Sequence, residues 1–312
     1  MSIIEYISFN PELDPCKSPC TICLGNFYGV HIGHAALVSK TIEMKKELSA
    51  TGKDVRAAAL CFSTLPVNYF GKNKIKNLIS LEDKLEVFRS LGLDGAYVCD
   101  FGAICSYSPY DFINKILFSE CSAIGAVCGF NYNFGAKAAG NSDTLKEHFL
   151  SKGFCFEMVP AVTKFGKVVS STLIREYIAG GDFEAANEML GRKFTISGTV
   201  VKDKELGRKL GFPTANIKPK ENMLLPEPGV YQTSTKVRGE IYKSITNVGT
   251  CPTVNDNNVK LETYILDFND DLYGDVIEII FLSKMREIIV FENVDALKEQ
   301  LKSDVLKRNE TN

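Results

Sequence analysis

Two of the three histidines in the chain, His31 and His34, lie three residues apart in a glycine-rich segment. This spacing places both imidazoles on one face of a helix's first turn, where free N–H groups and the helix dipole attract anions. Glycines at 25, 29 and 33 let the backbone approach a phosphate. We therefore expect a cradle for a reacting phosphate. The alternatives are chance helix capping and a zinc site, for which no further ligand stands at suitable spacing.

A second segment, residues 206–216, reads LGRKLGFPTAN. Its two glycines flank two cations and an apolar residue, and such a loop between strands can wrap a polyphosphate. Thr214 and Asn216 alternate as on a strand, so their oxygens face the same side. A hydroxyl and an amide oxygen suit Mg²⁺, which binds substrate phosphates. The alternative is a β-turn with a solvated charge pair.

A third segment, residues 170–175, reads SSTLIR. Ser and Thr favour the start of a helix, and Arg175 could clamp phosphate oxygens with two hydrogen bonds. The alternative is an ordinary helix cap followed by an exposed arginine.

Short apolar runs alternate with helical patterns from residue 20 to about residue 190. This alternation predicts a parallel sheet covered by helices on both faces. Ligands bind such sheets at the carboxyl ends of the strands, where the histidine segment lies. The expected strands are 21–24, 55–62, 95–99, 124–129 and 154–159, and the expected helices are 32–48, 80–91, 108–118, 144–151 and 183–190.

The residue pattern changes after about residue 190, where β-branched residues and turn signals dominate. Closely spaced strands of this kind predict an antiparallel barrel or sandwich. We place the domain limits at 1–186 and 187–312. The expected strands are 194–201, 231–237, 240–248, 259–268 and 276–282, followed by a closing helix over 293–304.

Composition excludes several classes of protein. The 312 residues carry a net charge of −2, whereas proteins that grip nucleic acid through phosphates usually carry a basic surplus. The N-terminus does not read as a signal peptide, and no apolar run reaches the length of a membrane span. Most of the ten cysteines lie in apolar runs, as expected for reduced thiols in a cytoplasmic protein. Zinc or redox chemistry at Cys20 and Cys23 is the disfavoured alternative.

The first and third segments resemble those of a known family. Residues 25–34, GNFYGVHIGH, are similar to the G-x-F-D-G-x-H-x-G-H motif of bacterial bifunctional riboflavin kinase/FMN adenylyltransferases, the FAD synthetases. Residues 129–135, GFNYNFG, resemble the segment near the flavin site of that family, and SSTLIR resembles its S-S-T-x-I-R motif. The resemblance implies a Rossmann-like nucleotidyltransferase domain with His31 and His34 as catalytic residues. It also implies ATP or flavin contacts from Gly25, Asn26, Phe27, Gly29, Gly33, Asn131, Phe134, Ser170, Ser171, Thr172 and Arg175.

The second segment resembles the G-R-x-L-G-F-P-T-A-N motif of riboflavin kinases. Further matches follow in order at 228–231, 247–253, 261–264, 271–274 and 286–291, so the resemblance covers about residues 18–305. It implies that Glu262 is the general base, a role that a carboxylate beside a primary hydroxyl can fill. It further implies a β-barrel kinase domain with Mg²⁺ held by Thr214 and Asn216, and ATP or flavin contacts from Gly207, Lys209, Gly211, Phe212, Pro213, Asn247 and Arg286.

The resemblance implies a cytoplasmic enzyme that converts riboflavin to FMN and FMN to FAD with ATP, without nucleic acid or membrane partners; protein partners are not indicated. Three departures from the family pattern lie in the expected nucleotidyltransferase domain. Tyr28 replaces an aspartate, Thr64-Leu65 replaces Pro-His, and Ala138 replaces a basic residue. Two alternatives therefore remain: a riboflavin kinase with a degenerate adenylyltransferase domain, and a flavin-binding regulator without either activity.

Overall fold

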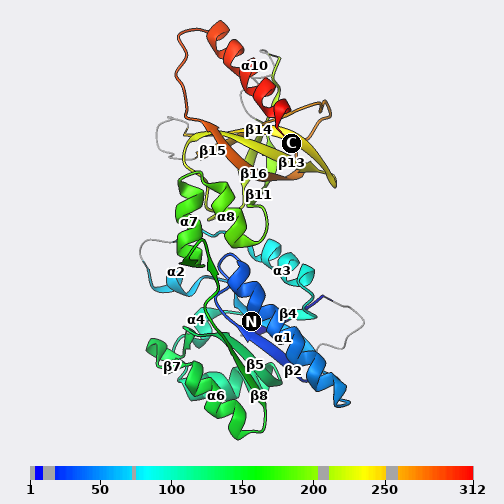
Figure 1. The fold of residues 1–312 in the computed structure, drawn as a ribbon, viewed down its shortest axis with the longest axis vertical. Coiled ribbons are helices and arrows are strands. Elements are labelled where there is room, and N and C mark those ends of the chain that lie inside the picture. Colours follow the sequence, from blue (N-terminus) through cyan, green and yellow to red (C-terminus); the bar gives the residue numbers. More distant parts are fainter. Residues whose placement is uncertain (1–3, 10–17, 72–74, 203–210, 251–258, 312) are drawn as a thin grey trace. The chain divides into compact units, whose positions relative to one another are not determined.

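The structure, a computed structural model, describes residues 4–9, 18–71, 75–202, 211–250 and 259–311. The chain falls into two units (Figure 1). Unit 1 comprises residues Met1–Ile75 and Ser80–Ser170, and unit 2 comprises Lys76–Ile79 and Ser171–Asn312.

Unit 1 contains a six-stranded sheet in the order β1-β4-β3-β2-β5-β8. All neighbours are parallel except the edge pair of β1 and β4. Strands β2 and β3 are buried along their whole length, as expected for central strands covered on both faces. The sequence predicts the five parallel strands but misses edge strand β1. The strands are β1 (Ile4–Ser8), β2 (Cys20–Leu24), β3 (Arg56–Phe62), β4 (Gly95–Cys99), β5 (Ala123–Gly129) and β8 (Cys155–Val159).

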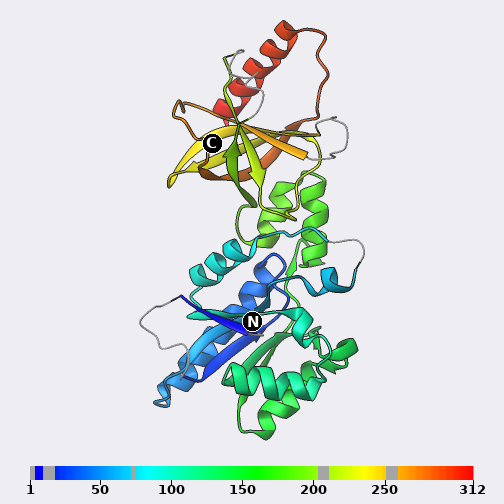
Figure 2. The same cartoon turned by 180° about the vertical axis from the view of Figure 1, so that it is seen from behind.

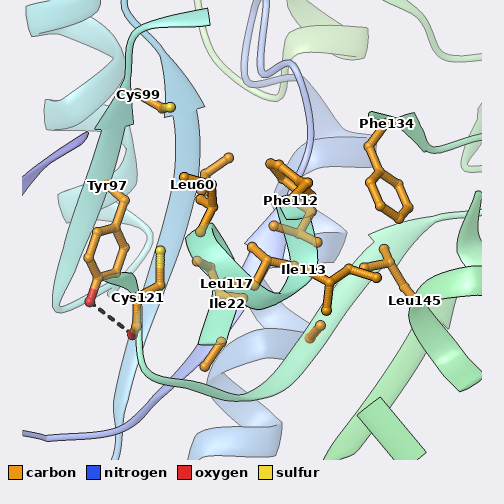
Figure 3. Packing of buried hydrophobic residues seen from close by; sticks show 14 of the residues in the cluster. Ile22, Leu60, Tyr97, Cys99, Phe112, Ile113, Leu117, Cys121, Phe134 and Leu145 are labelled. Carbon is orange, nitrogen blue, oxygen red and sulfur yellow. Dashed lines mark hydrogen bonds between the residues drawn. The ribbon is translucent and has the colours of Figure 1, made fainter. Parts of the chain in front are cut away.

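Helices cover both faces of this sheet, as the alternating pattern predicts. On one face, Phe112, Ile113 and Leu117 of η1 pack with Leu145 of α6 against strand residues such as Ile22 (Figure 3). On the other face, α1 and α3 pack against alternate strand residues. The main helices are α1 (Ile32–Ala50), α3 (Leu81–Ser90), the π-helix η1 (Phe112–Glu120) and α6 (Ser142–Ser151). Shorter elements are α2 (Pro66–Phe70), α4 (Phe101–Ile104), α5 (Pro109–Asp111), η2 (Ala136–Ala138), β6 (Asn133–Phe134), β7 (Gly140–Asn141), β9 (Thr163–Lys164) and β10 (Lys167–Val168).

Unit 2 contains a closed barrel in the order β11-β12-β15-β14-β13-β16, with antiparallel neighbours throughout (Figure 2). The sequence allows either a barrel or a sandwich, and the closed strand order shows that the unit is a barrel. The helices α7 (Ser171–Ala179) and α8 (Phe183–Leu190) precede the barrel and α10 (Val294–Glu310) follows it. The strands are β11 (Thr195–Val201), β12 (Thr214–Pro219), β13 (Gly229–Val237), β14 (Glu240–Thr250), β15 (Val259–Ile265) and β16 (Val276–Arg286).

Helix α8 is part of the barrel's own core. Phe183 is 1% exposed, and its ring lies 5.1 Å from that of Phe281 and 5.6 Å from that of Tyr231. The division between the units accordingly falls at Ser170, whereas the sequence places the domain limit after residue 186. Whether residues 187–312 fold alone stays a prediction.

Candidate active sites

The histidine pair caps the helix that leaves the first central strand. His31 is the N-cap of α1: its Nδ1 accepts the N–H of His34, and Nδ1 of His34 accepts the N–H of His31, both at 3.3 Å. The two rings stack with centroids 3.7 Å apart and planes inclined by 19°. The capping that the sequence offers as an alternative is therefore real, and it also fixes the position of both imidazoles.

The turn before the pair holds two left-handed backbones that are unusual for large residues. Phe27 has a φ of 48° and Val30 a φ of 45°, and both side chains are buried. Strain of this kind persists only where the surroundings impose it. Phe27 packs its ring 5.0 Å from His34 and 5.0 Å from Phe88. Phe27 is fully buried, so its ring supports His34, and its expected contact with a ligand stays a prediction.

Gly33 leaves room for the imidazole of His31. A Cβ at position 33 would lie 3.2 Å from Cε1 and Nδ1 of that ring, which is tighter than ordinary contact. Asn26 is exposed, and Gly25 lies at the end of β2. These residues lie where the carboxyl ends of the parallel strands meet, as expected for a ligand site.

The segment after β5 leaves the sheet from this same edge, because β5 runs parallel to β2. Asn131 is exposed, and its carbonyl accepts a hydrogen bond from Nδ2 of Asn133 at 3.0 Å. Phe134 is 6% exposed and lies against Phe112, with ring centroids 5.2 Å apart. The sheet therefore brings residues 25–34 and 129–135 to one edge, with Asn131 open to solvent and Phe134 in the core.

The expected phosphate clamp belongs partly to the other unit. Ser170 ends unit 1, whereas Ser171, Thr172 and Arg175 lie in α7 of unit 2. Nε of Arg175 donates to the carbonyl of Lys76 at 3.2 Å. Lys76 begins a short stretch, residues 76–79, that leaves unit 1 and joins unit 2.

Residues 76–79 join unit 2 through backbone hydrogen bonds that the sequence does not predict. The N–H of Asn77 donates to the carbonyl of Asn222, and the N–H of Leu224 donates to the carbonyl of Asn77, each at 2.7 Å. Pairing of one residue with a distant loop has no periodicity, so no sequence pattern signals it.

In the barrel, Glu262 lies between two amides on neighbouring strands. It is opposite Asn216 of β12 and opposite Asn247 of β14. Nδ2 of Asn247 donates to Oε2 of Glu262 at 3.4 Å. On the other face of these strands the hydroxyls of Thr246 and Thr263 hydrogen-bond at 2.9 Å in the interior, which fixes the register. The expected base thus stands in an ordered polar row.

The residues expected to hold Mg²⁺ fit a hard cation. Oδ1 of Asn216 is buried and accepts no hydrogen bond from any residue that the structure describes. An unpartnered buried carbonyl oxygen is costly unless a ligand satisfies it. Thr214 stands two residues earlier on β12, on the same side of the strand and opposite Tyr264. A hydroxyl and an amide oxygen are suitable Mg²⁺ ligands.

Residues 211–213, which are also expected at the barrel site, lead directly into β12. Phe212 packs against Tyr264, with ring centroids 5.5 Å apart, and Pro213 is exposed. Gly211 has a φ of 87°, a conformation that favours glycine. Gly207 and Lys209 lie outside the described residues.

Arg286 has partners that the sequence did not suggest. Its guanidinium binds the carboxylate of Asp304 in α10 through Nε at 3.1 Å and Nη2 at 2.7 Å. The Asp304 side chain is 2% exposed, and Gln300 also donates to it at 2.8 Å. Arg286 therefore anchors the last helix to the barrel, and its contact with a ligand stays a prediction.

Cys20 and Cys23, the pair considered for zinc or redox chemistry, are both buried. Burial raises the pKa of the Cys20 and Cys23 thiols to about 12. Across the described ranges, no three His, Cys, Asp or Glu side chains gather as a metal-binding group. In the same ranges, no helix has the length and apolar character needed to cross a membrane.

A parallel sheet with a histidine-capped helix, followed by a barrel with a carboxylate between two amides, defines a two-domain transferase acting on phosphate groups. The chain belongs to the bifunctional riboflavin kinase/FMN adenylyltransferase family. The family model described as FAD synthetase matches residues 13–173, and the model described as riboflavin kinase matches residues 190–311.

Relatives along nearly the whole chain agree with this assignment. The bifunctional riboflavin kinase/FMN adenylyltransferase of Bacillus subtilis is 32% identical, over 92% of this chain and 91% of the relative. The enzyme of the same name from Haemophilus influenzae is 33% identical, over 92% of each chain. A crystal structure described as a macrolide-efflux protein from Streptococcus pneumoniae has a TM-score of 0.86 and 25% identity, over 98% of this chain and 96% of the other. That likeness extends over both units.

Proposed function

We propose that this chain catalyses two consecutive reactions of flavin cofactor synthesis, from riboflavin to FMN and from FMN to FAD. ATP supplies a phosphate group in the first reaction and an adenylyl group in the second. The observation that carries the proposal is that one chain matches both family models. The described residues also include the histidine pair of one expected site and Glu262 of the other.

For the kinase reaction, we assign Glu262 as the general base. Its carboxylate takes the proton of the riboflavin 5′-hydroxyl as that oxygen attacks the γ-phosphorus of ATP, and ADP leaves. The hydrogen bond from Asn247 orients the carboxylate. Thr214 and Asn216 would hold Mg²⁺, which when bound neutralises charge on the phosphates.

For the adenylyltransferase reaction, we assign His31 and His34 as donors to ATP phosphate oxygens. A phosphate oxygen of FMN attacks the α-phosphorus, the bond from that phosphorus to the bridging oxygen breaks, and pyrophosphate leaves. The helix start and the two imidazoles stabilise the charge that develops. No covalent enzyme intermediate is required, because positioning and electrostatics suffice.

A kinase-only function is the second candidate, because the departures from the family pattern lie in unit 1, Tyr28 and Leu65 among them. Tyr28 is half-buried one residue before a buried glycine, and Leu65 is 8% exposed at the start of α2. Neither residue belongs to the histidine pair, so we favour the two-step function. We place both reactions in the cytoplasm, where ATP is available, with no role for nucleic acid or a membrane.

Chromatographic separation of the products tests the proposal. The protein is incubated with riboflavin, ATP and Mg²⁺, and samples are taken over time. We expect FMN to appear first and FAD to follow. FMN alone would favour the kinase-only function, and neither product would favour a flavin-binding regulator.

A further inference from the structure

The hydrogen bonds of the histidine pair determine where each ring carries its proton. A backbone N–H can only donate, so Nδ1 of His31 and Nδ1 of His34 are both acceptors. A neutral imidazole that accepts through one nitrogen carries its proton on the other. Both protons therefore lie on Nε2. A further proton on Nδ1 of either ring would remove one of the two bonds of the cap.

The rings around the pair hold this arrangement in place. The planes of His31 and His34 are nearly parallel at 3.7 Å, so two positive charges in this stack would repel each other. Phe27 lies 5.0 Å from His34 and is itself packed edge-on against Phe88. Phe27 and Phe88 are both 0% exposed, so their rings have little freedom to move. The imidazoles thus stand at the end of a packed row of rings.

We propose that the reciprocal cap locks both histidines as neutral Nε2–H donors, and that Phe27 is the positioning residue that maintains this state. The identity of the ligand, an ATP phosphate, rests on the proposed function. Neither histidine can then act as a general base, because Nδ1 is engaged and Nε2 is protonated. No general base is needed, because the second pKa of a phosphate monoester is about 6 and the attacking FMN phosphate is largely ionised at neutral pH.

The proton positions can be measured directly, because the chain has only three histidines. The full chain is labelled with ring-¹⁵N histidine, and long-range ¹H–¹⁵N spectra are recorded at pH 8 without ligand. Single histidine substitutions assign the signals. His148 is an internal control, because its Nδ1 lies 2.9 Å from the carbonyl of Thr144 and must donate. We expect Nε2–H signals from His31 and His34, and an Nδ1–H signal from His148.

The positioning role is tested by comparing Phe27→Leu with Phe149→Leu. Both changes remove a ring that is 0% exposed from unit 1, but Phe149 packs against Phe118 on the opposite face of the sheet from Phe27. We expect Phe27→Leu to lower the kcat of FAD formation between about 10-fold and 100-fold and to mix the tautomers of His34. Phe149→Leu should lose comparable thermal stability yet keep the tautomers and most of the activity. FMN formation by the barrel reports whether each variant is folded.

The outcomes separate this inference from the proposed function. An Nδ1–H or doubly protonated form of His31 or His34 at pH 8 would overturn the lock, even in a protein that makes FAD. Equal losses of FAD formation in both phenylalanine variants, with tautomers unchanged, would overturn the role of Phe27. Nε2–H signals in a protein that makes no FAD would uphold the lock and reject the adenylyltransferase function.

Discussion

The polar side chains of the two expected sites are held in different ways. His31 and His34 cap each other, because Nδ1 of each ring accepts the backbone N–H of the other residue. In the barrel, Glu262 is held by one amide, Asn247, while the oxygen of another, Asn216, has no partner in the described structure. The histidine pair is thus positioned by its mutual hydrogen bonds, whereas the row around Glu262 leaves one buried amide oxygen without a donor among the described residues.

Two substitutions of His31 separate its capping role from its donor role. Asparagine can accept the N–H of His34 as a good N-cap but cannot reproduce the Nε2–H, whereas alanine loses both. We expect both variants to lower FAD formation by about 10²–10³ and to spare FMN formation. Only His31→Ala should also lose about 1 kcal/mol of stability. Rates are measured with FMN supplied, and stability by denaturant unfolding. Unchanged FAD formation in His31→Asn would refute the donor role.

The departures at Tyr28 and Leu65 predict a weakened adenylyltransferase. Tyrosine is bulkier than aspartate in the turn before the histidines, and neither departure removes a group that handles phosphate. We expect Tyr28→Asp with Leu65→His to raise FAD formation from FMN, measured at several FMN and ATP concentrations. Because Leu65 is 8% exposed, its replacement costs packing, and the two single variants serve as controls. If the unsubstituted protein already forms FAD rapidly and the variants are no faster, the departures are neutral.

Helices and strands were predictable from sequence where burial is complete. The wholly buried runs of β2 and β3 and the alternation of β13 have clear periods. Edge strand β1 was missed because it precedes the alternation of strands and helices that begins near residue 20, and it pairs antiparallel with β4. The histidine spacing revealed a shared helix face, but the mutual cap depends on ring orientation, which no spacing specifies. Arg286 was expected at a ligand, and its pairing with Asp304 depends on where α10 docks.

The anchoring of α10 by Arg286 is testable. Breaking a buried ion pair leaves an uncompensated charge, so Asp304→Ala should cost about 3 kcal/mol of barrel stability. Lys236 and Glu278 form an exposed pair on the barrel at 3.3 Å, and Glu278→Ala is the matched control with little expected effect. Unfolding is followed by denaturant, and the KM for riboflavin and ATP is measured in parallel. An Asp304→Ala variant of unchanged stability would contradict the anchor.

On the scale of the whole molecule, the chain passes between its two units more than once, because residues 76–79 join the second unit. A cut at one position in the sequence therefore does not separate the units cleanly. The riboflavin kinase family model matches residues 190–311, whereas unit 2 of the structure also includes the preceding helices α7 and α8. The two limits make different predictions for fragments.

We expect the fragment 171–312 to fold and to form FMN. The shorter fragment 187–312 also contains the whole barrel but removes Phe183, which is 1% exposed and packs against Tyr231 and Phe281. Deleting a buried phenylalanine costs about 3–5 kcal/mol, so the shorter fragment should be less stable. Thermal unfolding and FMN production compare the two. Equal stability would place the domain limit near residue 187, and a folded but inactive longer fragment would show that unit 1 contributes to the kinase.

The central claim is that one chain carries two separable transfer sites, and reciprocal variants test it most directly. Glu262→Gln and His31→Asn are each given riboflavin with ATP and Mg²⁺, and separately FMN with ATP and Mg²⁺. We predict that Glu262→Gln forms no FMN but still converts supplied FMN to FAD. We predict that His31→Asn accumulates FMN and forms little FAD from either substrate. Loss of both activities in either variant, with the fold intact by circular dichroism, would contradict the account.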